Sequence, residues 1–154
     1  MLIGLISDTH SLVRPEALAA LRGSELIIHA GDVGRPEVLE RLREVAPTVV
    51  VRGNVDTAAW AKALPETETV AVGKHLIWVL HDIAGLDLDP TVGFAAVVYG
   101  HSHRPSISTR DGVLYVNPGS AGPRRFRLPV TVGRIDIQNG AARAKIVEVN
   151  LDED

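Results

Sequence analysis

Side chains that can bind a metal follow apolar, strand-like runs at five separate places in this chain. Asp8 and His10 come after the run at residues 2–7, and Asp32 comes after the run at residues 26–30. Three further runs, at residues 48–52, 76–80 and 95–99, are followed by Asn54, His81, His101 and His103. Ligands of open α/β sheets bind at the carboxyl ends of the strands. The recurrence therefore indicates one metal site that holds more than one ion.

The types and spacing of these side chains suit coordination. Asp8 and His10 are two residues apart, as are His101 and His103, so both members of each pair can turn toward one ion. Two carboxylates, an amide oxygen and four imidazoles, without a thiolate, suit Mn, Fe, Ni, Co or Zn better than Ca or Mg alone. Such a set is too large for one tetrahedral ion, whereas two ions about 3.5–4 Å apart with a bridging carboxylate fit it.

The first half of the chain alternates strand and helix patterns that would position these residues. Pro15 suits the first turn of a helix that Gly23 closes, and Pro36 opens a second helix that ends before Pro47. A short third helix is expected at residues 58–63. This β-α-β-α-β-α order predicts parallel strands with right-handed crossovers.

The second half has the pattern of three hairpins. Their strands are expected at residues 69–72 and 76–80, 106–109 and 113–116, and 130–137 and 142–149. Three hairpins supply enough strand for a second sheet against the first, so we predict an α/β fold of two packed sheets with helices outside. No internal repeat or linker is present, which predicts a single domain over residues 1–154.

Composition excludes several classes of function. Of the 154 residues, 45% are hydrophobic and 23% are charged, and the formal net charge is −3. Nothing here indicates a nucleic-acid or anionic-membrane partner. Cysteine is absent, which excludes disulfides, zinc–thiolate sites and thiol catalysis. No run approaches the roughly 18 apolar residues of a membrane span, so we expect a cytoplasmic protein without a membrane partner.

Taken in order, the motifs resemble the signature of the calcineurin-like metallophosphoesterases. They are Asp8-x-His10, Gly31-Asp32, Gly53-Asn54, His81 and Gly100-His101-x-His103. The segment Asn117-Pro118-Gly119-Ser120, followed by Pro123-Arg124, is similar to one in the small, single-domain bacterial and archaeal phosphodiesterases of that superfamily. The resemblance implies a four-layer α/β/β/α sandwich of two mixed sheets with flanking helices.

The resemblance also implies roles for the residues. One metal ion would be held by Asp8, His10, Asp32 and His103, and a second by Asp32, Asn54, His81 and His101, with Asp32 as the bridge. Asp32, Asn54 and His81 are accordingly the predicted catalytic residues. The two divalent ions, with Mn preferred over Ni, Co, Fe or Zn, would generate a bridging hydroxide that attacks the phosphorus of a small phosphodiester or nucleotide.

Two positions depart from the pattern of the family. Many members have a His after the Gly-Asn pair that is thought to assist the leaving group, but Val55 stands here and cannot donate a proton. The small phosphodiesterase branch also lacks this His. We therefore expect slow turnover and a preference for diesters with good leaving groups. Asp82 follows His81 where the branch more often has Gly, and it would add negative charge near the second ion or hydrogen-bond a ligand histidine.

Several residues allow a second interpretation. Arg104, Ser120 and Arg124 are predicted to bind the substrate phosphate, but the arginines also suit surface ion pairs and Ser120 suits a plain turn. Asn54, beside Gly53, also suits a turn. His29, inside the second strand, is predicted to be a core histidine or one that supports the ligands.

Rival functions are less well supported by the residues. The retromer scaffold subunit has a similar fold and binds proteins with a disabled metal site, so a weakly catalytic scaffold is the alternative, although all the ligands are present here. A nuclease acting on long nucleic acid would need a basic track, and only Arg124-Arg125-Phe126-Arg127 forms a basic cluster. Apolar hairpin edges could pair two copies into a homodimer.

Overall fold

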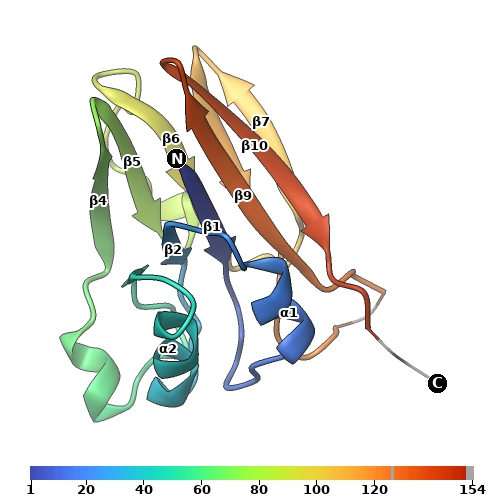
Figure 1. Ribbon diagram of the computed structural model, residues 1–154. Helices are drawn as coiled ribbons and strands as arrows, with labels where there is room; N and C mark the ends of the chain where they lie inside the picture. The colour runs from blue at the N-terminus through green and yellow to red at the C-terminus, as the bar shows by residue number, and fades with distance from the viewer. Residues whose placement is uncertain (126, 152–154) are drawn as a thin grey trace.

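The computed structural model of the chain describes residues 1–125 and 127–151, so Phe126 of the basic cluster lies outside the described residues. Within those residues two five-stranded sheets form, in the strand orders β10-β9-β1-β2-β3 and β4-β5-β6-β8-β7 (Figure 1). The strands are β1 (Leu2–Ile6), β2 (Leu26–His29), β3 (Thr48–Val50), β4 (Thr67–Val72), β5 (His75–Leu80), β6 (Phe94–Val98), β7 (Ser106–Arg110), β8 (Val113–Asn117), β9 (Thr131–Gln138) and β10 (Ala141–Glu148). The helices are α1 (Pro15–Ala20), α2 (Pro36–Arg43) and the 3-10 helices η1 (Ala59–Ala63) and η2 (Ile83–Gly85).

The alternating first half folds as predicted. Strand β1 pairs in parallel with β2, and β2 pairs in parallel with β3. Both α-helices begin at a proline, where the missing N–H is no loss. Leu18 of α1 and Leu39 of α2 pack with Ile6 and Ile27 on the outer face of the first sheet. The third predicted helix is a 3-10 helix, η1, rather than an α-helix.

The third hairpin joins the first sheet, and the expectation that all three hairpins build the second sheet is wrong. Strand β9 pairs antiparallel with β1, with Leu2 opposite Asp136 and Leu5 opposite Gly133. The reason is that β1 is buried and β2 covers only one of its edges. Its other edge would leave buried N–H and C=O groups unpaired without β9.

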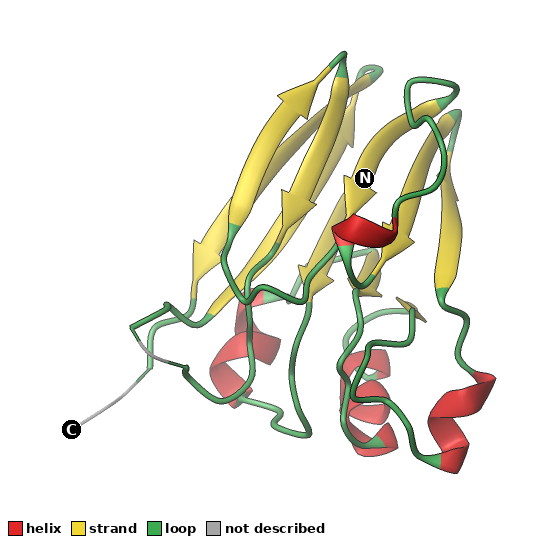
Figure 2. Cartoon of the chain, turned by 180° about the vertical axis from the view of Figure 1, so that it is seen from behind, coloured by secondary structure: helices red, strands yellow, loops and turns green. Residues whose placement is uncertain are grey.

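Four layers result, which confirms the predicted fold class. Residues such as Leu5 of β1 and Ile77 of β5 fill the space between the two sheets. The outer face of the second sheet packs Trp78 and Tyr115 against Ile83 of η2. This fourth layer is thin, because η2 is only three residues long. Figure 2 shows this short helical turn apart from the other helices, which gather at one end of the molecule.

The turns follow the chemistry of their residues. Asp111 and Gly112 join β7 to β8 with φ angles of 50° and 81°, and Asn139 and Gly140 join β9 to β10 with φ angles of 52° and 78°. Two successive positive φ angles match the twist of antiparallel strands, and Asp-Gly and Asn-Gly adopt them readily. Among the described residues, no helix has both the length and the hydrophobicity of a transmembrane segment.

Candidate metal centre

The predicted ligands gather where the carboxyl ends of β1, β2, β3, β5 and β6 converge. Six of them form two groups, and within each group the ligand atoms lie within 4.8 Å of one another: Asp8, His10 and His103 in the first, and Asp32, His81 and His101 in the second. Asn54 lies beside the second group, with its Oδ1 3.2 Å from Nδ1 of His101. The structure therefore brings together all seven residues that the sequence singles out.

The two groups are in contact. Nε2 of His81 lies 3.2 Å from Oδ2 of Asp32 and 3.8 Å from Oδ1 of Asp8. Nε2 of His10 lies 3.8 Å from the same oxygen of Asp32 and 3.9 Å from the same oxygen of Asp8. Each carboxylate thus faces a histidine of each group, which is the arrangement that a shared carboxylate between two neighbouring ions requires.

Each carboxylate has one oxygen held by the protein. Oδ2 of Asp8 accepts hydrogen bonds from Oγ of Ser7 at 2.7 Å and from the backbone N–H of His101 at 3.1 Å. Oδ1 of Asp32 accepts one from the backbone N–H of Val55 at 3.0 Å. The remaining oxygens face the histidines, and Oδ1 of Asp8 is buried without a hydrogen-bond partner among the described residues.

The tautomer of His81 follows from its surroundings. Its Nδ1 lies 2.7 Å from the carbonyl oxygen of Ala30, which can only accept, so Nδ1 carries the proton. In the neutral ring Nε2 then presents a lone pair toward Asp32 and Asp8, and it is buried without a hydrogen-bond partner among the described residues. A backbone carbonyl that fixes the tautomer in this way is the usual support of a metal-binding histidine.

Charge is unevenly distributed over the cluster. Burial raises the pKa of Asp8, and the opposing effects of His81, Ser7 and His103 do not cancel it. Burial acts in the same sense on Asp32, but the adjacent His81 and the Val55 N–H outweigh it and lower the pKa of Asp32. Burial disfavours a charged His81, yet the neighbouring carboxylates of Asp32 and Asp8 raise its pKa overall. The carboxylates therefore attract positive charge to the centre of the cluster.

A pair of divalent cations fits this arrangement. Oδ1 of Asp8 and Nε2 of His81 are two acceptors that face each other in a buried position, and buried acceptors of this kind are costly unless a cation or a proton lies between them. The donor set is imidazole nitrogen and carboxylate or amide oxygen, which suits Mn, Fe, Co, Ni or Zn.

Backbone strain is concentrated in the loops of the cluster. Positive φ angles occur at Asp8 (55°), His10 (45°), Asp32 (58°), His101 (73°) and His103 (64°). Such angles are uncommon for residues other than glycine and cost about 1–3 kcal/mol each. The surrounding structure must hold these loops firmly, which is typical of sites where side chains are aimed at a ligand.

Asp56 is a supporting residue that the sequence did not reveal. It is buried, and its carboxylate accepts hydrogen bonds from the N–H groups of Val33 at 3.2 Å, Gly34 at 3.1 Å and Gly53 at 2.9 Å. It thereby ties the loop after β2 to the loop after β3, which carry Asp32 and Asn54. No local signal identifies this role, because the role depends on which loop lies opposite.

The three predicted substrate-binding residues have different environments. Arg104 is exposed beside His103. Ser120 is buried, where its hydroxyl donates to the carbonyl oxygen of Asp8 at 3.0 Å and accepts from the N–H of Gly122 at 3.2 Å. Arg124 is exposed and its Nε donates to the carbonyl oxygen of Leu128 at 3.3 Å. For Ser120 the structure thus indicates support of the Asp8 loop, and substrate binding by the three residues stays a prediction.

Asp82 lies at the rim of the cluster. Its Oδ1 accepts a hydrogen bond from the N–H of Ala84 at 3.0 Å and so caps η2, while its Oδ2 lies 3.8 Å from Nε2 of His101. The carboxylate therefore places negative charge beside a predicted ligand of the second ion.

His29 supports the loops from inside β2. The ring is fully buried, its Nδ1 accepts from the N–H of Gly31 at 3.0 Å, and its Nε2 therefore donates to Oγ of Thr9 at 3.0 Å. Thr9 in turn donates to the carbonyl oxygen of Val33 at 2.9 Å. This chain of hydrogen bonds links the Asp8 loop to the Asp32 loop, and it requires a neutral His29.

The stability of the metal-free protein should depend on the neutrality of His29. Burial lowers the pKa of His29 from 6.5 to about 4. Between pH 6.5 and 4, His29 therefore binds a proton in the unfolded chain but not in the folded chain. The contribution of His29 to the free energy of unfolding is complete above pH 6.5. About 3 kcal/mol of it is lost as the pH falls to 4. In urea unfolding with chelator present, His29→Gln should lose less stability than the wild type between pH 7 and 4, by that amount. Parallel pH curves for the two proteins would contradict a buried, neutral His29.

Comparison with known proteins gives consistent results. Residues 1–140 match the calcineurin-like phosphoesterase superfamily domain. A protein of Methanothermobacter thermautotrophicus named probable metallophosphoesterase is 34% identical over 154 positions, which cover 88% of this chain and 87% of that protein. The phosphodiesterase YfcE of Escherichia coli strain K12 is 28% identical over 160 positions, which cover 84% of each chain.

A solved structure shares the fold. Vps29 from Entamoeba histolytica, in complex with Zn²⁺, matches with a TM-score of 0.73 at 22% identity, over 97% of this chain and 100% of that chain. At this identity the likeness shows the fold alone. The solved structure of an archaeal phosphodiesterase also matches, with a TM-score of 0.73 at 23% identity over 96% of this chain and 100% of that chain, so proteins named phosphodiesterase and Vps29 share this architecture.

Proposed function

This chain belongs to the calcineurin-like phosphoesterase superfamily and is a metal-dependent phosphoric diester hydrolase, and on that basis we propose that its candidate metal centre holds two divalent ions and hydrolyses small phosphodiesters. One observation carries the proposal. Oδ1 of Asp8 and, in the neutral ring, Nε2 of His81 are buried acceptors 3.8 Å apart that lack hydrogen-bond partners among the described residues. Bound cations would satisfy both.

The residues divide between two ions in the proposal. Asp8, His10, Asp32 and His103 would hold one, and Asp32, Asn54, His81 and His101 the other. The two groups of close ligand atoms support this division. Asp32 as the shared carboxylate is supported by the distances of its Oδ2 from His81 (3.2 Å) and His10 (3.8 Å).

Groups of the protein orient the ligands, whereas the leaving group receives no proton from Val55. Ser7 and the His101 N–H fix Asp8, the Val55 N–H fixes Asp32, and the Ala30 carbonyl fixes the tautomer of His81. Bound metal would supply Lewis-acid stabilisation of phosphoryl charge and lower the pKa of a water molecule toward 7. The side chain of Val55 is 45% exposed beside Asn54 and carries no proton to donate. A missing general acid costs about 10²–10⁴ in rate, so good leaving groups should be preferred.

Metal removal and reloading test the proposal. Protein stripped with chelator should not hydrolyse bis(p-nitrophenyl) phosphate, and reloading with Mn, Ni, Co, Zn or Mg in turn should restore activity, with Mn the expected best. The monoester p-nitrophenyl phosphate, run in parallel, should be the poorer substrate, and calorimetry should count two ions per chain.

Two results would contradict parts of the proposal. A single ion per chain at full activity would rule out the dinuclear centre. Bound ions without hydrolysis of any phosphate ester would favour the protein-binding scaffold, a function that the shared fold with Vps29 allows but does not favour.

A further inference from the structure

A pocket of about 270 Å³ opens beside the second group of predicted ligands. Six of the residues that line it bear polar or charged side chains: Arg52, Asn54, Glu66, Thr67, His81 and Asp82. Asn54 and His81 belong to the candidate metal centre, so the pocket is continuous with it. An ester group of a phosphodiester held at the centre can therefore extend into this space.

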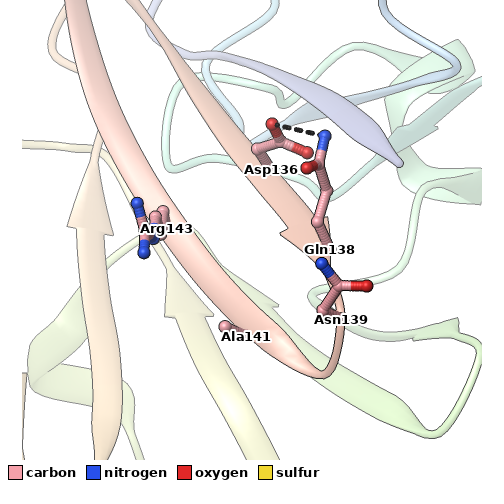
Figure 3. Close-up of a pocket in the computed structure, with 5 residues that line it drawn as sticks. All are labelled: Asp136, Gln138, Asn139, Ala141 and Arg143. Atoms are coloured by element: carbon pink, nitrogen blue, oxygen red, sulfur yellow. Dashed lines mark hydrogen bonds between the residues drawn. The ribbon is translucent and has the colours of Figure 1, made fainter.

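The pocket at the opposite end of the first sheet's hairpin lacks this connection. The pocket in Figure 3 lies at the β9–β10 hairpin and includes Asp136, Gln138 and Arg143, none of which is a candidate ligand. Its acidic group is engaged locally, because Nε2 of Gln138 donates to Oδ2 of Asp136 at 3.3 Å. The contents of the pocket beside His81, in contrast, would lie next to two residues of the candidate metal centre, Asn54 and His81.

The walls of this pocket carry two carboxylates and one guanidinium. Nη2 of Arg52 lies 2.6 Å from Oε1 of Glu66, so the guanidinium is already paired. Asp82, which follows His81 in sequence and is half exposed, adds a second carboxylate. An anionic group would meet two carboxylates and one neutralised cation. A cationic group would meet the carboxylate of Asp82, but also the guanidinium of Arg52 and the divalent ions proposed at the adjacent centre.

A neutral group with several hydroxyls fits these walls best. Hydroxyls can donate to the carboxylates of Glu66 and Asp82 and accept from Arg52 and the hydroxyl of Thr67. A purely apolar group would desolvate those groups without replacing their hydrogen bonds, which is the larger penalty. The volume accommodates a substituent of the size of glycerol or a pentose.

We propose that the pocket lined by Arg52, Glu66 and Asp82 binds a neutral polyol ester group of the substrate and so determines specificity. The proposal rests on the proposed phosphodiesterase function. The polyol is the group retained on the monoester product, because its alkoxide is a poor leaving group and Val55 offers no proton to it. The P–O bond that breaks is the one to the other, better leaving group, while water supplies the new oxygen on phosphorus.

Diesters that share the p-nitrophenolate leaving group and differ in the retained group test this specificity. Retained glyceryl, n-propyl, 2-carboxyethyl and choline groups compare a polyol with apolar, anionic and cationic groups of similar length. With the metal-loaded protein, kcat/KM for the glyceryl diester should exceed that of each other diester by about tenfold. Equal kcat/KM values for the four would overturn the proposal.

Variants that replace a wall carboxylate with an amide test whether the pocket residues cause the preference for the glyceryl diester. Asp82→Asn and Glu66→Gln should each lower the ratio of kcat/KM for the glyceryl diester to kcat/KM for the propyl diester, by about threefold or more. Glu66→Gln also frees Arg52 and should raise the relative kcat/KM for the carboxyethyl diester. Glu44→Gln is the matched control, because Glu44 at the C-cap of α2 makes an exposed ion pair with Nε of Arg41 at 3.5 Å and does not line the pocket.

The outcomes separate this proposal from the proposed function. If Glu66→Gln and Asp82→Asn keep the wild-type ratio, the pocket assignment is wrong while the hydrolase stands. If no diester is hydrolysed with any metal, the proposed function is wrong. The pocket is then judged by calorimetry with glycerol 3-phosphate and propyl phosphate on the metal-loaded protein, where equal affinities would overturn it.

Discussion

Asp32→Asn should lower kcat/KM for bis(p-nitrophenyl) phosphate by about 10³-fold or more and leave the fold intact. The carboxylate faces a histidine of each ligand group, and a neutral amide cannot balance the charge of two cations. The fold should survive because the amide oxygen can still accept from the Val55 N–H, and because the buried cluster loses one negative charge. Steady-state kinetics, calorimetric metal counting and thermal unfolding measure the three effects.

Asp111→Asn is the matched control for this variant. It makes the same change of carboxylate to amide in the exposed β7–β8 turn, where φ is 50° and asparagine is well tolerated. Its kinetics and metal content should equal those of the wild type. Full activity in Asp32→Asn or in Asp32→Ala would contradict both the shared carboxylate and the proposed hydrolysis mechanism.

Gly53→Ala should disable the centre although it replaces none of the predicted ligands. A Cβ at residue 53 would overlap the backbone nitrogen and Oδ1 of Asp32, and a backbone atom cannot give way as the end of a flexible side chain can. The loops after β2 and β3 would have to separate, which moves Asp32 relative to Asn54. A displacement of about 1 Å in such a site can cost 10² in rate, so we expect a loss of that size in kcat/KM together with about 1–3 kcal/mol of stability.

Gly73→Ala distinguishes this steric effect from the general cost of replacing glycine. Gly73 lies in the β4–β5 turn with a φ of 59°, and a Cβ there meets nothing within 4 Å. It should lose about 1 kcal/mol of stability because alanine disfavours positive φ, and it should keep full activity. Wild-type metal affinity and kcat/KM in Gly53→Ala would show that the two loops are not held at close contact.

Sequence predicted the elements well because their signals are local. Prolines mark the starts of α1 and α2, and the Asp111-Gly112 turn marks one hairpin. The ligand positions followed from where strands end, and the family and the fold class are confirmed. The coordination roles of the ligands stay predictions.

Interactions between distant segments could not be predicted in the same way. The sequence allowed either phosphate binding or a plain turn for Ser120, and nothing near it indicated that its hydroxyl donates to the carbonyl of Asp8, 112 residues away in sequence. Asp56 organises three N–H groups from two loops, and nothing in its neighbours indicates this. The placement of β9 beside β1 likewise depends on which strand edge is left open after the parallel strands have paired.

The pairing of β9 with β1 has a consequence for how the protein is made. A ribosome delivers β1 first and its second neighbour more than a hundred residues later, since Leu2 pairs with Asp136. Until then the first sheet has an open edge, and for most of that time the contacts of Ser120 with Asp8 and of Ala121 with Ser7 are also missing. Contacts this distant in sequence slow folding and expose unpaired strands to aggregation. The metal-binding end of the first sheet should therefore form only after synthesis of β9, and nascent chains halted before residue 131 should neither retain metal nor resist proteolysis.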